Sequence, residues 1–323
     1  MVRMLTGLAL IALSTLAAQA QSWPDRPVKI VVPYAAGGGT DVVARVMADR
    51  LSDAFGQRFI VENRPGVGGM IGAETIARSA PDGYALLVSS PAEIAINQHV
   101  YKKINYDPLK DLAPITLIAW TPLIITAHPD LKIGSPSELI ALLKARAGQL
   151  TYSSPGVGSA QHLAGEFLKK TAAVDMKHIA YRGAAPAVQD VVAGHVPITI
   201  SGMPPVVELV RSGKLSAVGV TSAKRSPLLP NTPALAELGS EFAAFDITNW
   251  FGFFAPAGLS EEIGQKLHRA AVKALDDPVV RQRIAEQGAE AVGNTAAEFA
   301  AFIAAESAKY AQIAKLSGVR ADE

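Results

Sequence analysis

VKIVVPYAAGGGTDVVARVMADRLSDAF, residues 28–55, holds two expected elements and the loop that joins them. Val28–Pro33 is an apolar, largely β-branched run and predicts a buried strand. Asp41–Phe55 repeats its apolar residues at helical spacing and predicts an amphipathic helix. Three consecutive glycines, residues 37–39, stand between the two. Because glycine lacks the Cβ that holds a ligand away from the main chain, the loop predicts close approach of a ligand to its backbone.

The same alternation of short apolar runs and helical-period segments continues along the chain. Further strands are expected at 58–62, 84–90, 150–153, 177–181, 197–201 and 216–221, and further helices at 70–79, 136–146, 160–170 and 187–193. Strands that alternate with helices favour a parallel sheet of the α/β class. Residues 249–254 add an aromatic run, after which only helices are expected, from residue 260 to 316.

A strand, a glycine loop and a helix start also follow one another in LTYSSPGVGSAQH, residues 150–162. Ser159 is a preferred N-cap residue for a helix that begins at Ala160. The first N–H groups of a helix lack internal partners and carry partial positive charge, so such a helix start binds an anion without help from Lys or Arg. Each loop taken alone fits a tight turn with an ordinary N-cap equally well.

A third strand ends in HIAYRG, residues 178–183, where an arginine and a glycine precede another expected helix. The guanidinium group of Arg182 can bind a carboxylate through two parallel hydrogen bonds. The alternative is a surface ion pair, which is the commoner situation of an arginine side chain. In a parallel sheet these loops lie at the carboxyl ends of the strands, where ligands of α/β proteins bind.

The first twenty residues have the pattern of a secretory signal peptide. Arg3 supplies the positive start, residues 5–18 are apolar, and Ala18-Gln19-Ala20 fits a cleavage site of small residues. We expect cleavage near Ala20 and export of the mature chain. No later stretch is long and apolar enough to span a bilayer.

Composition excludes several classes of protein. The chain has no cysteine, which rules out disulfides, Cys-ligated metals and a Cys nucleophile. Removal of residues 1–20 takes away Arg3 and no acid, so Lys plus Arg falls from 30 to 29 against 29 Asp plus Glu. This balance argues against nucleic acid or an anionic membrane as the main partner.

No catalytic or cofactor motif stands out. The sequence lacks GxxxxGK[ST], GxSxG and HExxH, and the glycines at 66–72 depart from the GxGxxG fingerprint. Ser159 and His162 would lie on one helix turn, which is a poor geometry for a nucleophile and its base. We therefore expect no enzymatic activity, no cofactor and no metal site. An exported hydrolase is the alternative, which turnover of esters would test.

Two apolar segments are candidates for crossings between lobes, namely 115–126, which Trp120-Thr121-Pro122 splits in two, and 245–254. They divide the mature chain into a first lobe of residues 21–120 and 248–323 and a second lobe of residues 121–247. A chain of this length commonly forms two domains. The alternative is one continuous sheet with long loops.

Seven stretches occur in order along the chain: WPDRPVKIVVPYAAGGGTDVVAR, VENRPGVGGMIGAE, APDGYALLVSS, YSSPGVGSAQHLAGE, HIAYRGAAPAVQDVVAG, SGKLSAVGVTSAKRSPLLPNTPALAE and NWFGFFAPAG. Together they resemble the Bug proteins, the periplasmic solute-binding components of tripartite tricarboxylate transporters. The resemblance runs from Trp23 to Gly258 and continues less distinctively through the helical tail. It implies a type II periplasmic-binding-protein fold: two α/β lobes with a ligand cleft between them and a helical C-terminal tail.

The resemblance also implies a ligand site. In the family, backbone and water contacts from the loop after the first strand hold a carboxylate, and the corresponding residues here are Tyr34, Ala36, Gly38 and Gly39. The facing loop corresponds to Ser154, Gly158 and Ser159. We also expect Ser89, Ser90 and Arg182 to line the cleft.

Ser201 departs from the family pattern, because many members carry an Asp just before the segment that is Gly202–Pro205 here. Loss of a carboxylate in the cleft disfavours a ligand with an amino group. It suits a ligand whose far end is uncharged or carries a second carboxylate.

The expected function is capture of a small organic carboxylate and its delivery to inner-membrane transporter subunits. The ligand favours closure of the lobes because both lobes contact it. We expect a monomer that has no nucleic-acid partner. A sensor that presents its ligand to a membrane signalling kinase is the alternative, and di- and tricarboxylates, aromatic acids and hydroxy acids all remain open as ligands.

Overall fold

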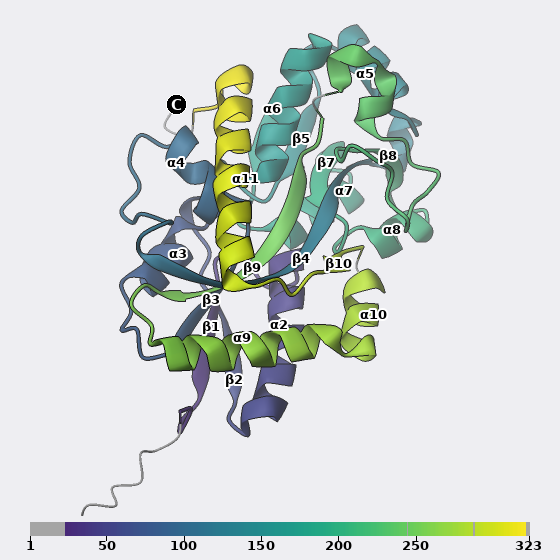
Figure 1. Cartoon of the computed structure of the whole chain (residues 1–323). Helices are drawn as coiled ribbons and strands as arrows, with labels where there is room; N and C mark the ends of the chain where they lie inside the picture. The colour runs from purple at the N-terminus through teal and green to yellow at the C-terminus, as the bar shows by residue number, and fades with distance from the viewer. Residues whose placement is uncertain (1–22, 244, 287, 321–323) are drawn as a thin grey trace, which may run out of the picture.

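The computed structural model describes residues 23–243, 245–286 and 288–320 (Figure 1). The signal peptide predicted for residues 1–20 lies outside the described residues. In the part of the chain that is described, no helix is long and apolar enough to cross a membrane. The strands in that part pair into one ten-stranded sheet, and the two halves of the sheet share the strand β4.

The first half of the sheet is built from the N-terminal βαβ units. β1 (Val28–Val32) lies between β2 (Phe59–Asn63) and β3 (Ala85–Ser89), and both pairs are parallel. The connecting helices are α2 (Gly39–Phe55) and α3 (Met70–Ala77). β9 (Thr248–Pro256) runs antiparallel to β3 and to β4 (Leu112–Ala127), so the sheet is mixed rather than purely parallel.

The second half repeats the alternation. β5 (Thr151–Ser154) lies between β6 (Lys177–Ala180) and β7 (Ile198–Gly202) and is parallel to both. β4 pairs antiparallel with β7 and with β8 (Ser216–Val220). The helices of this half are α5 (Pro136–Ala145), α6 (Ala160–Ala172), α7 (Ala184–Val192) and α8 (Val207–Arg211).

β4 and β9 connect the two halves (Figure 1). Residues 112–122 of β4 pair with β9 in the first half, and residues 123–127 pair with β7 and β8 in the second. Trp120-Thr121-Pro122 does not interrupt the strand, because the sixteen residues form one element. The strand that pairs with β4 changes just after Pro122. The register of β4 against β9 shifts twice, and the shift directly after Pro114 accommodates this proline within a paired strand.

The segment after β9 contains α9 (Glu261–Asp276), α10 (Pro278–Glu286) and α11 (Ala296–Ser317). The expectation of helices alone is wrong at β10 (Glu290–Ala291), which pairs with Trp120 and Ala119 of β4. Two residues are too few to give a periodic signal. α11 packs against α6 and also against residues 92–100, so the C-terminal helix contacts both halves (Figure 1).

Residues 92–100, for which no helix was expected, form the π-helical turn η2 (Ala92–Ile96) and then α4 (Asn97–Val100). All five residues of η2 are buried, so the segment shows no amphipathic period. The 3₁₀ turns are η1 (Val67–Gly69), η3 (Pro129–Leu131), η4 (Leu235–Leu238) and η5 (Ser240–Phe242).

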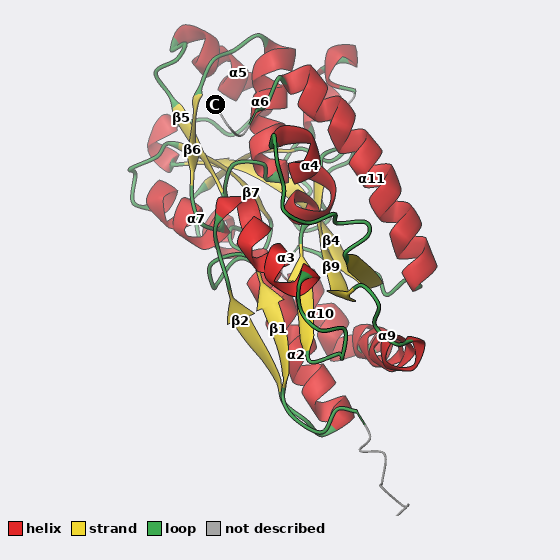
Figure 2. Cartoon of the chain, turned by 90° about the vertical axis from the view of Figure 1, so that its left-hand side faces the viewer, coloured by secondary structure: helices red, strands yellow, loops and turns green. Residues whose placement is uncertain are grey.

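The quoted strand and helix pack on each other as their periodicity predicts. The buried face consists of Val28, Ile30, Val32, Val43, Met47 and Leu51. Burial of each such side chain contributes about 1.5–3 kcal/mol. Since the glycine loop joins β1 to α2, this packing fixes both ends of the loop; Figure 2 shows α2 beside β1.

Candidate functional site

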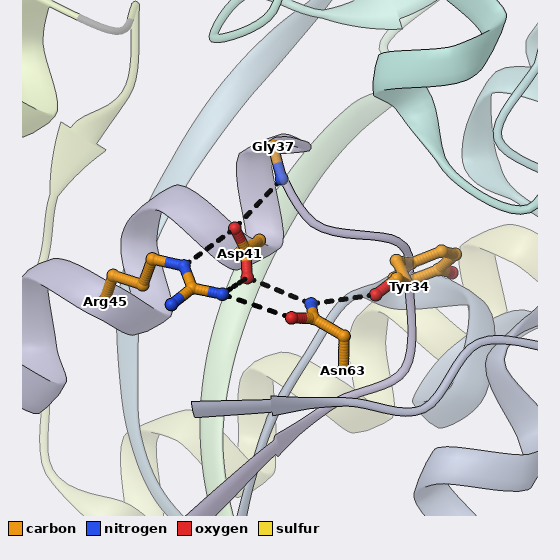
Figure 3. Close-up of polar contacts among 5 residues, drawn as sticks. All are labelled: Tyr34, Gly37, Asp41, Arg45 and Asn63. Carbon is orange, nitrogen blue, oxygen red and sulfur yellow. Dashed lines mark hydrogen bonds and ion pairs between the residues drawn. The ribbon is translucent and has the colours of Figure 1, made fainter. Parts of the chain in front are cut away.

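The glycine loop is held in shape by Asp41, in the first turn of α2 (Figure 3). Asp41 Oδ2 accepts hydrogen bonds from the N–H of Gly37 at 2.9 Å and from Arg45 Nε at 3.0 Å. Its Oδ1 accepts from Arg45 Nη2 and from Asn63 Nδ2, each at 2.9 Å. Asn63 Nδ2 also donates to the carbonyl oxygen of Tyr34 at 3.0 Å. One carboxylate therefore connects both ends of the loop to β2.

Electrostatics keep Asp41 ionised. Burial alone would raise the pKa of this carboxyl, but the hydrogen bonds from Arg45, Gly37 and Asn63 hold the pKa below its usual value. A carboxylate in the first turn is also stabilised by the positive end of the helix dipole. The Asp41 carboxylate thus already has its partners in the loop, in α2 and in β2.

Two helix starts face each other across the loop. The N–H of Ala35 donates to the carbonyl oxygen of Arg182 at 3.0 Å, and a Cβ built on Gly38 would lie 3.7 Å from the Cβ of Ala184. α2 and α7 both follow a glycine, Gly38 or Gly183, whose position offers no side chain to cap the first N–H groups. Both starts therefore keep free N–H groups and partial positive charge.

A cavity of about 30 Å³ lies at these helix starts. Its lining comprises Tyr34, Gly38, Gly39, Thr40, Ser90, Pro155, Gln161, Ala184, Gly202, Pro204, Pro205, Asn249 and Phe251. None of these residues carries a formal charge. Polar recognition at this place therefore comes from backbone N–H groups, hydroxyls and amides.

Four of the predicted site residues line this cavity: Tyr34, Gly38, Gly39 and Ser90. The others do not. Ala36 is exposed, and Arg182 is exposed while its main chain accepts the Ala35 hydrogen bond. Ser89 is buried and donates to Glu93, and Ser201 is buried and donates to the carbonyl oxygen of Gly202 at 3.0 Å.

The predicted residues of the second loop have internal partners instead. Ser159 donates to the carbonyl oxygen of Gly156 at 2.7 Å and accepts from the N–H of His162 at 3.1 Å, as expected of an N-cap. Ser154 Oγ is 2.6 Å from His178 Nε2. A Cβ on Gly158 would lie 2.5 Å from Asn97 Oδ1. This loop contributes Pro155 and, one turn on, Gln161 to the cavity.

Two stacked histidines lie behind the second loop. The rings of His162 and His178 are 4.0 Å apart between centroids and nearly parallel. Burial lowers the pKa of His162 to about 4, and burial together with the His162 ring lowers that of His178 to about 3. Both rings are therefore neutral at pH 7, and His162 Nδ1 accepts from the N–H of Gly158 at 3.3 Å.

Sequence reasoning missed several polar lining residues, notably Thr40, Gln161 and Asn249, which are all largely buried. Thr40 and Gln161 stand in the first turns of α2 and α6, next to residues that were singled out. Asn249 opens the run Asn249–Phe254, which was interpreted only as a crossing between lobes. A polar residue at the start of a buried apolar run is the signal that could have identified it.

In the described part of the chain, no group of three or more His, Asp or Glu side chains could hold a metal ion.

A family model described as "Tripartite tricarboxylate transporter family receptor" matches residues 43–319. The chain belongs to this family. The resemblance to Bug proteins is thereby confirmed. BugT of Bordetella pertussis is 38% identical over 302 residues, which are 93% of this chain and 92% of BugT.

Two solved structures of this receptor family's fold superpose closely. Rpa4515 of R. palustris with adipate is 34% identical with a TM-score of 0.89, over 92% of this chain and 99% of that one. MatC (Rpa3494) of Rhodopseudomonas palustris with bound malate is 30% identical with a TM-score of 0.86, over 90% of this chain and 99% of that one. The predicted type II periplasmic-binding-protein fold is confirmed, and the family and fold are those of periplasmic solute-binding proteins rather than enzymes.

Proposed function

We propose that this receptor captures a small organic carboxylate between two lobes and delivers it to a tripartite tricarboxylate-type membrane transporter. The observation that carries the proposal is the pair of uncapped helix starts, α2 and α7, that meet at a cavity whose lining has no charged side chain. Free N–H groups at helix starts donate hydrogen bonds to carboxylates, and the helix dipoles stabilise the negative charge of the anion. The solved structures of Rpa4515 and MatC are described with adipate and with bound malate, and both molecules are small organic carboxylates.

Ligand entry requires the lobes to separate. The cavity of about 30 Å³ is far below the roughly 300–1,000 Å³ of a small-molecule pocket. We propose hinge motion at β4 and β9, with residues 21–120 and 248–323 moving as one lobe and residues 121–247 as the other. The ligand then stabilises the closed state by contacts that both lobes make. A monomer suffices for this mechanism.

The polar groups of the cavity lining indicate the chemistry of the part of the ligand that lies away from its bound carboxylate. Gln161 and Asn249 offer amides, and no acidic side chain of the lining awaits an ammonium group. We propose a ligand without an amino group, whose far end is uncharged or a second carboxylate. Tighter binding of an amino acid than of its dicarboxylate analogue would contradict this.

Thermal shift on refolded, ligand-free protein tests the proposal. A carboxylate at 100 times its Kd stabilises the fold by about 2.7 kcal/mol, which moves the Tm visibly. The variant Gly38→Asp places a negative charge at the start of α2 and should abolish the shift. Gly134→Asp, at a position with open space around it, is the matched control and should keep it. A panel of mono-, di- and tricarboxylates that leaves the Tm of the wild type unchanged would overturn the proposal.

A further inference from the structure

A buried carboxyl group lies directly behind the cavity wall. Glu93, in η2, is 1% exposed. Its Oε2 accepts hydrogen bonds from Ser89 Oγ at 2.7 Å, from Ser90 N at 3.1 Å and from Ser90 Oγ at 3.2 Å. Ser90 Oγ is also 3.1 Å from the hydroxyl of Tyr34. Because Tyr34 and Ser90 both line the cavity, two hydroxyls in series connect the cavity to Glu93.

The second oxygen of Glu93 lacks a partner. Oε1 is buried and has no hydrogen bond to any described residue. It lies against Gly69, where a Cβ would come within 1.9 Å of it. An ionised carboxylate with an unpaired oxygen in such a place is costly. Burial accordingly raises the pKa of Glu93 above its usual value, although its hydrogen bonds act in the opposite direction.

The groups that face Glu93 come from several elements. Tyr34 approaches from the loop after β1, and the Tyr106 hydroxyl donates to the Glu93 carbonyl oxygen at 2.7 Å. Burial raises the pKa of the Tyr106 hydroxyl, and the neighbouring Glu93, Glu74 and Tyr101 side chains raise it further. α11, which packs on η2, pairs Glu306 with Lys309 and with the Trp250 indole, and it bonds His99 through Ser307. The side chains that contact the carboxyl group are thus hydroxyls. Among the described residues, no cation shifts the pKa of Glu93.

The charge of Glu93 decides which way the two hydroxyls point. An ionised carboxylate only accepts, so Ser90 donates to it, Tyr34 donates to Ser90, and oxygen lone pairs face the cavity. Lone pairs repel a carboxylate ligand. When Glu93 is neutral, Ser89 Oγ and Ser90 N still satisfy its carbonyl oxygen, and the hydroxyls of Ser90 and Tyr34 are free to donate into the cavity.

We propose that Glu93 is a positioning residue that takes up a proton when an anion binds, so that Ser90 and Tyr34 turn their hydroxyl hydrogens toward the ligand. This inference rests on the proposed carboxylate-binding function and adds a proton to it. The receptor then binds its anion more tightly at lower pH, with the strongest effect where Glu93 of the free protein is ionised.

Calorimetric titration tests the coupling, with adipate and malate as probes between pH 5 and 9. At each pH the titration is run in buffers of different ionisation enthalpy, which reveals proton uptake as a change in apparent heat. The wild type should take up as much as one proton, and its Kd should rise by up to tenfold per pH unit above the pKa of Glu93. Protonation of the probe's own carboxyl groups at low pH has the opposite effect, because it weakens binding and raises the Kd. Glu93→Gln, which imitates the neutral acid, should bind without proton uptake and with a flat pH profile.

Glu138→Gln, on the exposed surface of α5, is the matched control and should keep the wild-type profile. A wild type that binds a probe without proton uptake overturns the inference and leaves the proposed function standing. The same holds for proton uptake that survives in Glu93→Gln. Absence of binding in every variant contradicts the proposed function instead.

A second measurement needs no ligand. A carboxyl whose folded pKa is raised stabilises the fold fully below its unfolded pKa, and this stability is lost as the pH rises toward the folded pKa. The Tm of the wild type should therefore fall relative to that of Glu93→Gln as the pH rises from about 4.5, near the unfolded pKa. A Tm difference that stays constant with pH contradicts the raised pKa of the buried Glu93 carboxyl in the ligand-free fold.

Discussion

The N–H of Ala35 donates a 3.0 Å hydrogen bond to the carbonyl oxygen of Arg182 and thereby connects the loop after β1 to the loop before α7. The two loops follow strands of different halves of the sheet, β1 and β6, and the contact brings the starts of α2 and α7 together. No side chain takes part in it. The contact therefore depends on how closely the two backbones can approach, which the neighbouring glycines decide.

Gly183→Ala should weaken carboxylate binding about tenfold while the protein stays folded. Gly183 has φ +148° and ψ 170°, a region almost restricted to glycine, where another residue costs about 1–3 kcal/mol. Its new Cβ would also lie 3.1 Å from the nitrogen of Ala35. Calorimetry gives the Kd. Gly134→Ala, which meets nothing within 4 Å, should bind as the wild type does, and equal affinities for all three proteins would contradict the prediction.

Asp41→Asn should lower the free energy of unfolding by about 1–3 kcal/mol, because hydrogen bonds to a charged group are lost from Arg45 and from the N–H of Gly37. Urea unfolding at pH 7 measures the change. The matched control on the same helix is Asp53→Asn, whose exposed pair with Arg50 at 3.7 Å contributes about 0–1 kcal/mol. Similar losses in the two variants would show that Asp41 has no special role in the loop.

The pH dependence of Asp41 has a definite sign. Its folded pKa is lowered, so its contribution to stability is present above the unfolded pKa, about 3.9, and is lost as the pH falls through the folded pKa. In Asp41→Asn this part of the acid sensitivity should vanish. The stabilities of variant and wild type should then converge in unfolding titrations as the pH falls through the folded pKa, and a gap that stays constant into acid would contradict the assignment.

The stacked histidines predict a loss of stability in a higher pH range. The folded pKa values of His162 and His178 are lowered to about 4 and about 3, so the unfolded chain binds the protons first. Stability is complete above about pH 6.5 and falls as the pH drops below it, by at most about 1.4 kcal/mol per pH unit for each ring. His178→Gln should flatten the fall between pH 6.5 and 4. Equal slopes in the variant and the wild type would contradict the prediction.

The glycine loop and its helix could be predicted because their signals are local. The helical period of Val43, Met47 and Leu51 and the strand at Val28–Val32 both lie within thirty residues, and both were confirmed. The resemblance to a family, carried by seven stretches, fixed the fold class. α2 begins at Gly39, two residues before the predicted start at Asp41. Glycine has a low helix propensity, so no signal in the sequence marked this part of the first turn.

What could not be predicted depends on contacts between distant segments. No local feature of HIAYRG, residues 178–183, indicates that the main chain of Arg182, rather than its side chain, contacts the first glycine loop. Glu93 was missed because a single acid in the apolar run 92–96 resembles a solvated helix position, whereas the π-helical turn buries it. Ser154 and Ser159 have the residue types of a ligand site, but their hydroxyls satisfy partners of their own loop and of β6.

Gly69 and Glu93 should show strong energetic coupling. Gly69 has φ +86°, and a Cβ there would lie 1.9 Å from Glu93 Oε1, so Gly69→Ala should cost at least about 2–3 kcal/mol of unfolding free energy. Glu93→Ala removes the obstructing carboxyl, and the double variant should lose less than the two single losses together by about 0.5–3 kcal/mol. Urea unfolding of the four proteins closes the cycle. Gly264→Ala, inside α9, is the control and should gain about 0.5–1 kcal/mol, because alanine favours the helix where space is open. Simple additivity would mean that the backbone at Gly69, rather than the approach of Glu93, sets the requirement for glycine.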